Sequence, residues 1–148
     1  MSRYRAALAA AARGWPVVPL RPHDKVPALR GWADEATLDR DRIRRWWSRR
    51  PYNVGIPCGP AGLLVVDLDV PHGREAFARR AWQHGDEDPR DTYTVATPSG
   101  GEHRYFQAPD VPLGNTAGRI APHVDTRGVG GYVVAAGSLV GRGRYRVA

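Results

Sequence analysis

The sequence has a single cysteine, a single lysine and no long apolar run, and each shortage excludes a class of protein. Lone Cys58 rules out an internal disulfide and a cysteine-cluster zinc site, which favours a cytoplasmic setting. No apolar stretch approaches the roughly 20 residues that would cross a bilayer, so no membrane partner is expected. Lys25 does not stand in a Gly-Lys-Ser/Thr sequence, so the chain has no P-loop and is not a self-contained ATPase or helicase.

The positive charge is concentrated in the first third of the chain. Residues 1–50 hold 12 Lys/Arg against 5 Asp/Glu, whereas residues 51–148 hold 10 of each. Phosphate backbones are attracted to such a surface through counterion release, which indicates a nucleic-acid partner. A genome whose base composition favours arginine codons would explain the same excess of positive charge equally well. The length of 148 residues and the 42% hydrophobic content fit one globular domain.

Helices are predicted early in the chain and strands later, an order typical of an α+β domain with a mixed or antiparallel sheet. Helices are predicted at 3–13, 37–50 and 74–84, with Thr37 as the N-cap of the second. Strands are predicted at 17–20, 53–57, 63–70, 92–97, 102–107, within 123–138 and at 144–147, with a Pro/Gly-rich connection before 123. The second helix carries a basic surface that is our candidate nucleic-acid-binding site: Arg44, Arg45, Arg49 and Arg50.

The strand at 63–70 carries two closely spaced acids. Side chains alternate along a strand, so Leu64, Val66, Leu68 and Val70 form an apolar face and Asp67 and Asp69 lie side by side on the other. Neighbouring carboxylates repel each other, and a hard divalent cation such as Mg²⁺ or Mn²⁺ would relieve the repulsion. A solvated strand end, with acids facing water or pairing with arginines, is the alternative.

The segment 97–106 combines a glycine turn with a histidine. Gly100 and Gly101 allow a tight turn whose N–H groups can receive phosphate oxygens, and Ser99 adds a hydroxyl donor. His103 lies just inside the next strand, and Arg104 projects to the opposite face. A plain hairpin with a structural histidine is the alternative.

A third segment, 124–134, places Asp125 and Arg127 on one face of a strand. They form either a salt bridge or a third metal ligand beside a phosphate clamp. Together, the carboxylates of the three segments can hold one or two metal ions, which in two-metal sites lie about 3.5–4 Å apart. The glycine turn, His103 and Arg127 would orient a triphosphate, since phosphoryl transfer needs mainly positioning and charge neutralisation.

These segments, in this order, resemble the bifunctional DNA primase/polymerase (prim-pol) family of the archaeo-eukaryotic primase superfamily. The resemblance extends from Gly14 to Tyr145. It is carried by Lys25-Val-Pro27 with Gly31-Trp32, Asn53-Val-Gly-Ile56 with Gly59, Val65-Val-Asp-Leu-Asp-Val70, Ser99-Gly-Gly-x-His103 and Val124-Asp-Thr-Arg-Gly-x-Gly-Gly-Tyr132. The chain departs from the family at residues 135–145, where relatives often have prolines before a similar tyrosine.

The resemblance implies a role for each candidate residue. Asp67, Asp69 and Asp125 would be the catalytic acids that bind Mg²⁺ or Mn²⁺ in a two-metal site. The triphosphate would contact Ser99, Gly100, Gly101, His103 and Arg127, and Lys25 is a weaker candidate for contacting nucleotide or template. The implied fold is a two-lobed α/β domain, with a basic helical lobe at about 1–60 and an RRM-like mixed sheet at about 61–148 that carries the acids.

The implied activity is template-dependent nucleotidyl transfer, as a DNA primase, a DNA polymerase or both. Its partners would be a single-stranded or primed DNA template, dNTPs or NTPs, and a helicase or accessory priming domain, since family proteins frequently continue into such regions. The chain is then either an excised domain or a minimal stand-alone protein. Two alternatives stay open: a catalytically silent nucleic-acid or nucleotide-binding module of the same fold, and a metal-dependent nuclease.

Overall fold

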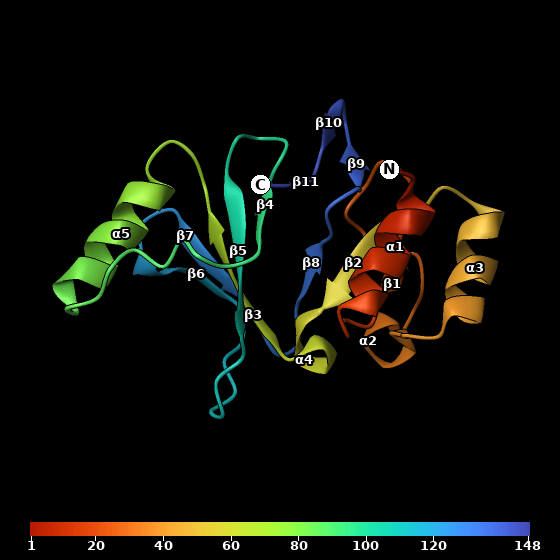
Figure 1. Cartoon of the computed structure of the whole chain (residues 1–148), viewed down its shortest axis with the longest axis horizontal. Coiled ribbons are helices and arrows are strands. Elements are labelled where there is room, and N and C mark those ends of the chain that lie inside the picture. Colours follow the sequence, from red (N-terminus) through yellow and green to blue (C-terminus); the bar gives the residue numbers. More distant parts are fainter.

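The computed structural model describes residues 1–148, and its strands form two main sheets beside a short hairpin (Figure 1). The larger sheet has the order β11-β4-β5-β3-β7-β6, the smaller has the order β1-β2-β8, and β9 pairs with β10. The strands are β1 (Val18–Leu20), β2 (Asn53–Pro57), β3 (Leu63–Leu68), β4 (Thr94–Ala96), β5 (Glu102–Gln107), β6 (Thr116–Ala121), β7 (Val124–Arg127), β8 (Tyr132–Val134), β9 (Leu139–Val140), β10 (Gly143–Arg144) and β11 (Arg146–Val147).

Every strand pairing is antiparallel. The prediction of helices combined with an antiparallel sheet is therefore confirmed, whereas the mixed sheet implied by the resemblance is wrong. Two helices lie in the connection between the neighbours β1 and β2, and another helix follows β3, but none of these helices joins a parallel strand pair.

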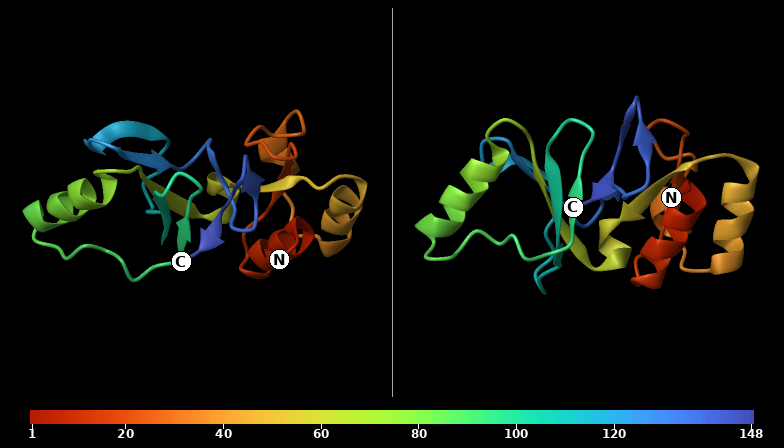
Figure 2. Two further views of the ribbon diagram at one scale, coloured as in Figure 1. Left: turned by 90° about the horizontal axis from the view of Figure 1, so that it is seen from above. Right: turned by 45° about the horizontal axis from the view of Figure 1, so that its top comes forward.

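The five helices are divided between the two sheets: α1 (Arg3–Ala12), α2 (Trp32–Glu35), α3 (Arg40–Arg49), α4 (Cys58–Ala61) and α5 (Gly73–Gln83). In Figures 1 and 2, α1, α2 and α3 gather around the three-stranded sheet, and α5 lies at the far side of the six-stranded sheet. The strand β8 belongs to the last fifth of the chain, yet it pairs with β2 and completes the sheet of the N-terminal segment. None of the helices has the length and apolar character that a membrane crossing requires.

The six-stranded sheet buries both of its faces in different ways. Its inner face contributes Val65 and Tyr105 to the main hydrophobic cluster, which also takes in Ala7 of α1, Ile43 of α3 and Val54 of β2. Its outer face contributes a smaller cluster, in which Val66, Leu68 and Val124 pack against Ala76 and Phe77 of α5. The inner face is therefore the one that faces the rest of the molecule.

Two predicted element boundaries are wrong for local reasons. The helix expected from residue 37 begins at Arg40, because the side chain of Asp39 caps it by accepting a hydrogen bond from Asp41 N at 3.0 Å. Thr37 instead forms a β-bridge with Val17, and its hydroxyl accepts a hydrogen bond from Asp39 N at 3.0 Å. The strand expected at 63–70 ends at Leu68, and Val70, which was expected on the apolar face, is 42% exposed.

Candidate functional site

A row of polar side chains crosses the centre of the six-stranded sheet. Asp67 of β3 lies directly opposite His103 of β5 and directly opposite Asp125 of β7. Directly paired residues on adjacent antiparallel strands project to the same face, so these three side chains share the inner face. Arg127 lies two residues beyond Asp125 and therefore projects to that face as well. The predictions that Asp125 and Arg127 share a face, and that Arg104 faces away from His103, are confirmed.

Asp67 lies between the two cationic or hydrogen-bonding groups of this row. Its Oδ1 is 3.5 Å from His103 Nε2, and its Oδ2 is 4.0 Å from Arg127 Nη2. Burial opposes ionisation of Asp67, but His103, Arg127 and Lys25 outweigh it and hold the pKa of this carboxyl below its ordinary value. Both contacts are longer than a hydrogen bond of about 2.7–3.2 Å. The carboxylate is thus ionised at neutral pH, and its oxygens are only loosely held.

His103 is buried with one ring nitrogen unused. The residue is 8% exposed, and Nδ1 has no hydrogen-bond partner. Its ring lies 5.9 Å, centroid to centroid, from the ring of Tyr145, a residue that is only 4% exposed. Burial and the negative charge of Asp67 raise the pKa of the Tyr145 hydroxyl. A buried imidazole with a free nitrogen is uncommon in a purely structural position, because buried polar atoms are usually hydrogen-bonded.

The other two acids lie near Asp67 in a more exposed setting. Asp69 follows the end of β3 and is exposed, and its backbone N–H donates to His123 O at 3.0 Å. Partial burial and the negative charges of Asp67 and Asp125 raise the pKa of Asp69. Asp125 Oδ1 accepts a hydrogen bond from Gly118 N at 2.9 Å. The carboxylates therefore repel one another, although no three His, Cys, Asp or Glu side chains converge closely enough in this structure to hold a metal ion.

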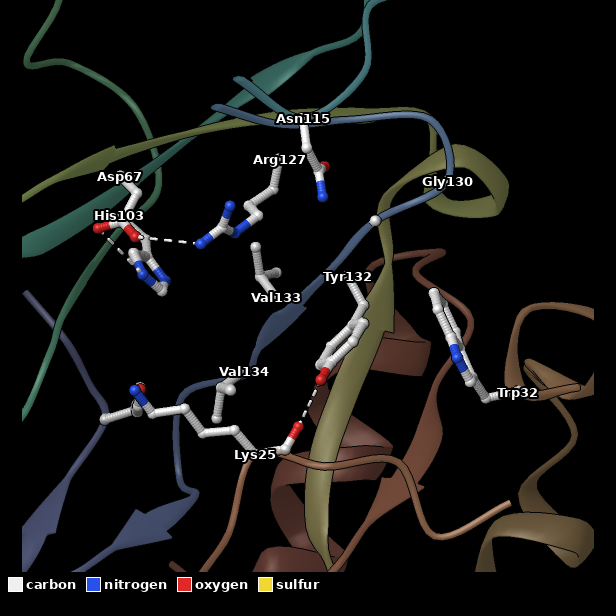
Figure 3. Close-up of a pocket in the computed structure, with 12 residues that line it drawn as sticks. Lys25, Trp32, Asp67, His103, Asn115, Arg127, Gly130, Tyr132, Val133 and Val134 are labelled. Carbon is white, nitrogen blue, oxygen red and sulfur yellow. Dashed lines mark hydrogen bonds and ion pairs between the residues drawn. The ribbon is translucent and has the colours of Figure 1, made fainter. Parts of the chain in front are cut away.

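A cavity of about 300 Å³ opens beside this row, between the two sheets (Figure 3). Asp67, His103 and Arg127 line one side of it, and Trp32 and Tyr132 line the other. Lys25 lines the same cavity, and its side chain extends past Val134, away from Tyr132 (Figure 3). The structure thus brings Lys25 together with three of the predicted site residues.

The glycine turn and Ser99 lie outside this cavity. They follow β4 and lie against the end of β3, where a Cβ atom on Gly101 would collide with the carbonyl oxygen of Leu68. Ser99 Oγ is 3.1 Å from Thr97 Oγ1, and the N–H of Gly100 is used within the turn, where it donates to Thr97 O at 3.0 Å. The turn therefore borders the segment that carries Asp69.

Among the lining residues that were not predicted as site residues, four have aromatic or polar side chains. Trp32, Tyr132 and Tyr145 entered the sequence reasoning only as landmarks of the resemblance, and Asn115 gave no signal at all. Tyr145 reaches the cavity because the chain returns from β10 to β11 across the inner face, where Tyr145 N donates to Ser138 O at 3.0 Å. No local sequence pattern predicts this position, because Tyr145 stands between two arginines in a glycine-rich segment.

Helix α3, which carries the basic surface, lies at the opposite end of the molecule from α5 (Figure 1), and none of its residues lines the cavity. Arg44 forms an exposed ion pair with Asp41 at 3.3 Å. Arg45, Arg49 and Arg50 form no ion pair. This surface keeps most of its positive charge free, as a phosphate-binding surface requires.

The comparison with family sequence models gives one match. The family described as "Bifunctional DNA primase/polymerase, N-terminal" matches residues 7–148, which is nearly the whole chain. No curated protein sequence matches the chain.

Proposed function

The chain belongs to the bifunctional DNA primase/polymerase family, and on that premise we propose that it is a template-dependent nucleotidyltransferase. Family membership suggests a DNA primase/polymerase with DNA and nucleotide substrates. The observation that carries the proposal further is the row in which Asp67 is in register with both His103 and Asp125, with Arg127 on the same face. The RRM-like character of the sheet that holds this row is part of the same proposal.

The donor set fits Mg²⁺ or Mn²⁺. Asp67, Asp69 and Asp125 supply carboxylate oxygens, the ligands that hard divalent cations prefer. The raised pKa of Asp69 reflects, after burial, the charges of Asp67 and Asp125, and a cation bound among them would relieve that repulsion. Metal ions bound there would lower the pKa of the primer 3′-hydroxyl and neutralise charge on the triphosphate and the leaving pyrophosphate. We assign these three residues as the metal ligands.

The remaining side chains of the row would hold the triphosphate. Arg127 is about one-third exposed, with a side-chain exposure of 36%, so it can turn unused N–H groups toward phosphate oxygens. His103 can donate from a ring nitrogen, and Lys25 supplies a second full positive charge to the cavity. Ser99, Gly100 and Gly101 would contact the triphosphate from the neighbouring turn. These groups together position the α-phosphorus for attack by the 3′-hydroxyl oxygen, with loss of pyrophosphate.

The template would be bound elsewhere on the molecule. The free guanidinium groups of α3, together with Arg44, form the proposed contact with the backbone of single-stranded or primed DNA. A helicase or accessory priming domain as a further partner, and a cytoplasmic location, belong to the same proposal.

A catalytically silent nucleotide-binding module is the second candidate. It is favoured by one observation, the failure of three acidic or histidine side chains to converge on a common point. Both candidates predict nucleotide binding, and they differ in whether a metal-dependent product forms.

A template-dependent extension assay tests the proposal. Primed and unprimed single strands are incubated with Mg²⁺ or Mn²⁺, with dNTPs and NTPs supplied separately. We expect metal-dependent products that disappear in the double variant Asp67→Ala/Asp69→Ala. The matched control is Asp86→Ala/Glu87→Ala, which removes two exposed acids from the loop after α5 and should leave synthesis unchanged.

The outcomes separate the candidates. Products in the unprimed reaction would establish priming as well as extension. Binding of metal and nucleotide without any product would favour the silent module. Strand shortening with Mg²⁺ alone, in place of extension, would favour a nuclease.

A further inference from the structure

The cavity between the sheets has two chemically different ends. Asp67, His103 and Arg127 make one end charged, whereas Trp32 and Tyr132 make the other end aromatic (Figure 3). A nucleotide has the same division, because its phosphates are anionic and its base is a flat aromatic ring. The cavity volume of about 300 Å³ is at the lower end of the range for small-molecule sites, so the cavity would enclose only part of a nucleotide.

The aromatic end is built on the three-stranded sheet and is held in place. Tyr132 begins β8, opposite Pro57 of β2, and its hydroxyl donates to Lys25 O at 2.6 Å. The ring of Trp32 packs against that of Tyr132 at a centroid distance of 5.0 Å and an interplanar angle of 70°. Both rings therefore have a fixed position relative to Lys25, whose side chain leads toward the charged end.

The exposure of Trp32 is not explained by the hydrophobic core. Trp46 and Trp47 are buried at 9% and 8% exposure, and Trp82 is 78% exposed on the surface. Trp32 is half-buried, and it packs against neither hydrophobic cluster, although Tyr132 does pack against the main one. An indole held against a second ring at a cavity wall, with part of its surface left free, is a surface on which a base can stack.

Two glycines that also line the cavity stand immediately before Tyr132. Gly130 has a φ of +86°, and a Cβ atom on Gly131 would overlap the side chain of Asn115. Asn115 Oδ1 accepts a hydrogen bond from Gly128 N at 3.0 Å, which fixes the amide and leaves its NH₂ group without a protein acceptor. The wall beside the rings therefore carries one free donor, at the junction between the aromatic and charged ends.

We propose that the indole face of Trp32, held in place edge to face by Tyr132, forms the platform on which the base of the incoming nucleoside triphosphate stacks, with the triphosphate directed toward Arg127 and His103. This inference rests on the proposed function and adds to it the location of the base. Stacking is tolerant of sequence, since every base has a π-face. The platform therefore binds all four nucleotides and leaves the choice of base to the template, as a copying enzyme requires.

Calorimetric titration with Mn²⁺ and no DNA tests the platform. The ligands are the four dNTPs, each titrated separately, and inorganic tripolyphosphate, which has the charge of the phosphates without a base. We expect Trp32→Ala to weaken binding of each dNTP by about 5- to 150-fold, the range that loss of one stacking contact gives. Purine nucleotides should lose more than pyrimidine nucleotides, and tripolyphosphate should bind within about 2-fold of wild type, because Trp32 is remote from the charged end.

Two further variants separate stacking from other effects. Tyr132→Phe keeps the ring but removes the hydrogen bond to Lys25 O, so any loss should fall equally on the dNTPs and on tripolyphosphate. Trp82→Ala removes an exposed indole of α5 that does not line the cavity, so the affinity for neither ligand should change. Because Trp32 packs against neither cluster, its removal should leave the fold intact, and retained tripolyphosphate binding reports this directly.

The result that overturns the platform is unchanged dNTP affinity in Trp32→Ala, or an equal loss for tripolyphosphate. If dNTP binding is unaffected in that variant but falls in Arg127→Ala, the base lies elsewhere and the proposed function stands. If wild-type protein binds neither dNTP nor tripolyphosphate, both the platform and the proposed function fail.

Discussion

The two faces of the six-stranded sheet each carry a cluster of charges, and the clusters are built differently. On the outer face, Arg104 donates from Nη1 to Asp88 at 2.6 Å and from Nε to Glu102 at 2.8 Å, with its side chain only 3% exposed. On the inner face, Asp67 has its nearest charged neighbours at 3.5 and 4.0 Å, and His103 keeps an unused nitrogen.

The balance of charge differs in the same way. Each outer carboxylate has a second arginine, since Arg74 contacts Glu102 and Arg90 lies 2.7 Å from Asp88. Burial opposes ionisation there, but the arginines lower the pKa of both acids. On the inner face, burial and neighbouring carboxylates raise the pKa of Asp69. Every charge of the outer cluster has close partners, whereas on the inner face three carboxylates lie near one another and Arg127 is held only loosely, 4.0 Å from Asp67. This difference is the one expected if the inner row is the proposed nucleotide site.

The largest difference is expected when Asp69, the acid next to the inner row, is neutralised. Asp69→Asn should lower the rate of primer extension by at least about 10²-fold, because a charged ligand for the metal is lost. DNA binding should stay largely intact. The free energy of unfolding should be equal or slightly higher, since Asp69 is exposed and is repelled by Asp67 and Asp125. Extension kinetics and urea unfolding of the same preparation give both quantities.

Asp86→Asn, in the exposed loop after α5, is the matched control for that change. If Asp69→Asn extends primers at nearly the wild-type rate, the assignment of Asp69 as a metal ligand is wrong.

The opposite pattern is expected on the outer face. Arg104→Met should reduce the free energy of unfolding by about 1–3 kcal/mol, because two partly buried carboxylates each lose a partner and keep only one arginine. Extension activity per folded molecule should stay within about 2-fold of wild type, since Arg104 faces away from the row. Urea unfolding and active-site-normalised kinetics test both statements.

Arg90→Met provides the control, since its side chain is 79% exposed and should contribute less than about 0.5 kcal/mol. Loss of activity in Arg104→Met without loss of stability would reverse the roles that we assign to the two faces.

A smaller effect is expected on a third region, the basic surface of α3. Arg45→Glu/Arg49→Glu should weaken single-stranded DNA binding and reduce the slope of log affinity against log salt by about 1 to 1.5. Arg79→Glu/Arg80→Glu on α5 makes the same change in net charge at the other end of the molecule. Equal slopes for the two variants would show a net-charge effect and would remove α3 as the template surface.

The smallest effect is the response of stability to acid. The pKa values of Asp88 and Glu102 are lowered in the folded state, so their contribution is fully present above their unfolded values of about 3.9 and 4.3. This contribution to the free energy of unfolding is lost as the pH falls through the pKa values of the folded state, which are lower. Urea unfolding at about pH 7, 5, 4 and 3 should therefore show a decline below about pH 4 that is shallower in Arg104→Met. An identical decline in both proteins would mean that the outer cluster is not its source.

Local patterns predicted the inner row better than they predicted its surroundings. Alternation along β3 and β5 was enough to separate Asp67 from Val66 and His103 from Arg104, because the period of two is a property of each strand alone. The resemblance then joined Asp125 to Asp67, and the register of β3 with β7 places them opposite each other. The roles of these residues in metal and phosphate binding stay predictions.

The surroundings of the row depend on pairings between distant segments, which no local pattern specifies. Edge strand β6 was expected as a connection, because Gly118 interrupts it and its residues do not alternate in polarity. The pairing of β8 with β2, and the return of Tyr145 to His103, each join residues separated by dozens of positions. Thr37 is a residue type that commonly caps helices, but here it forms a β-bridge with Val17, and Asp39 caps the helix instead.

The position of β8 also bears on how the molecule folds. Val133 pairs with Ile56, 77 positions earlier in the chain, and a contact of such sequence separation closes a large loop before it stabilises anything. Until residues 132–134 have been synthesised, β2 lacks one of its two neighbouring strands. The three-stranded sheet therefore cannot be completed during synthesis before the last fifth of the chain has emerged.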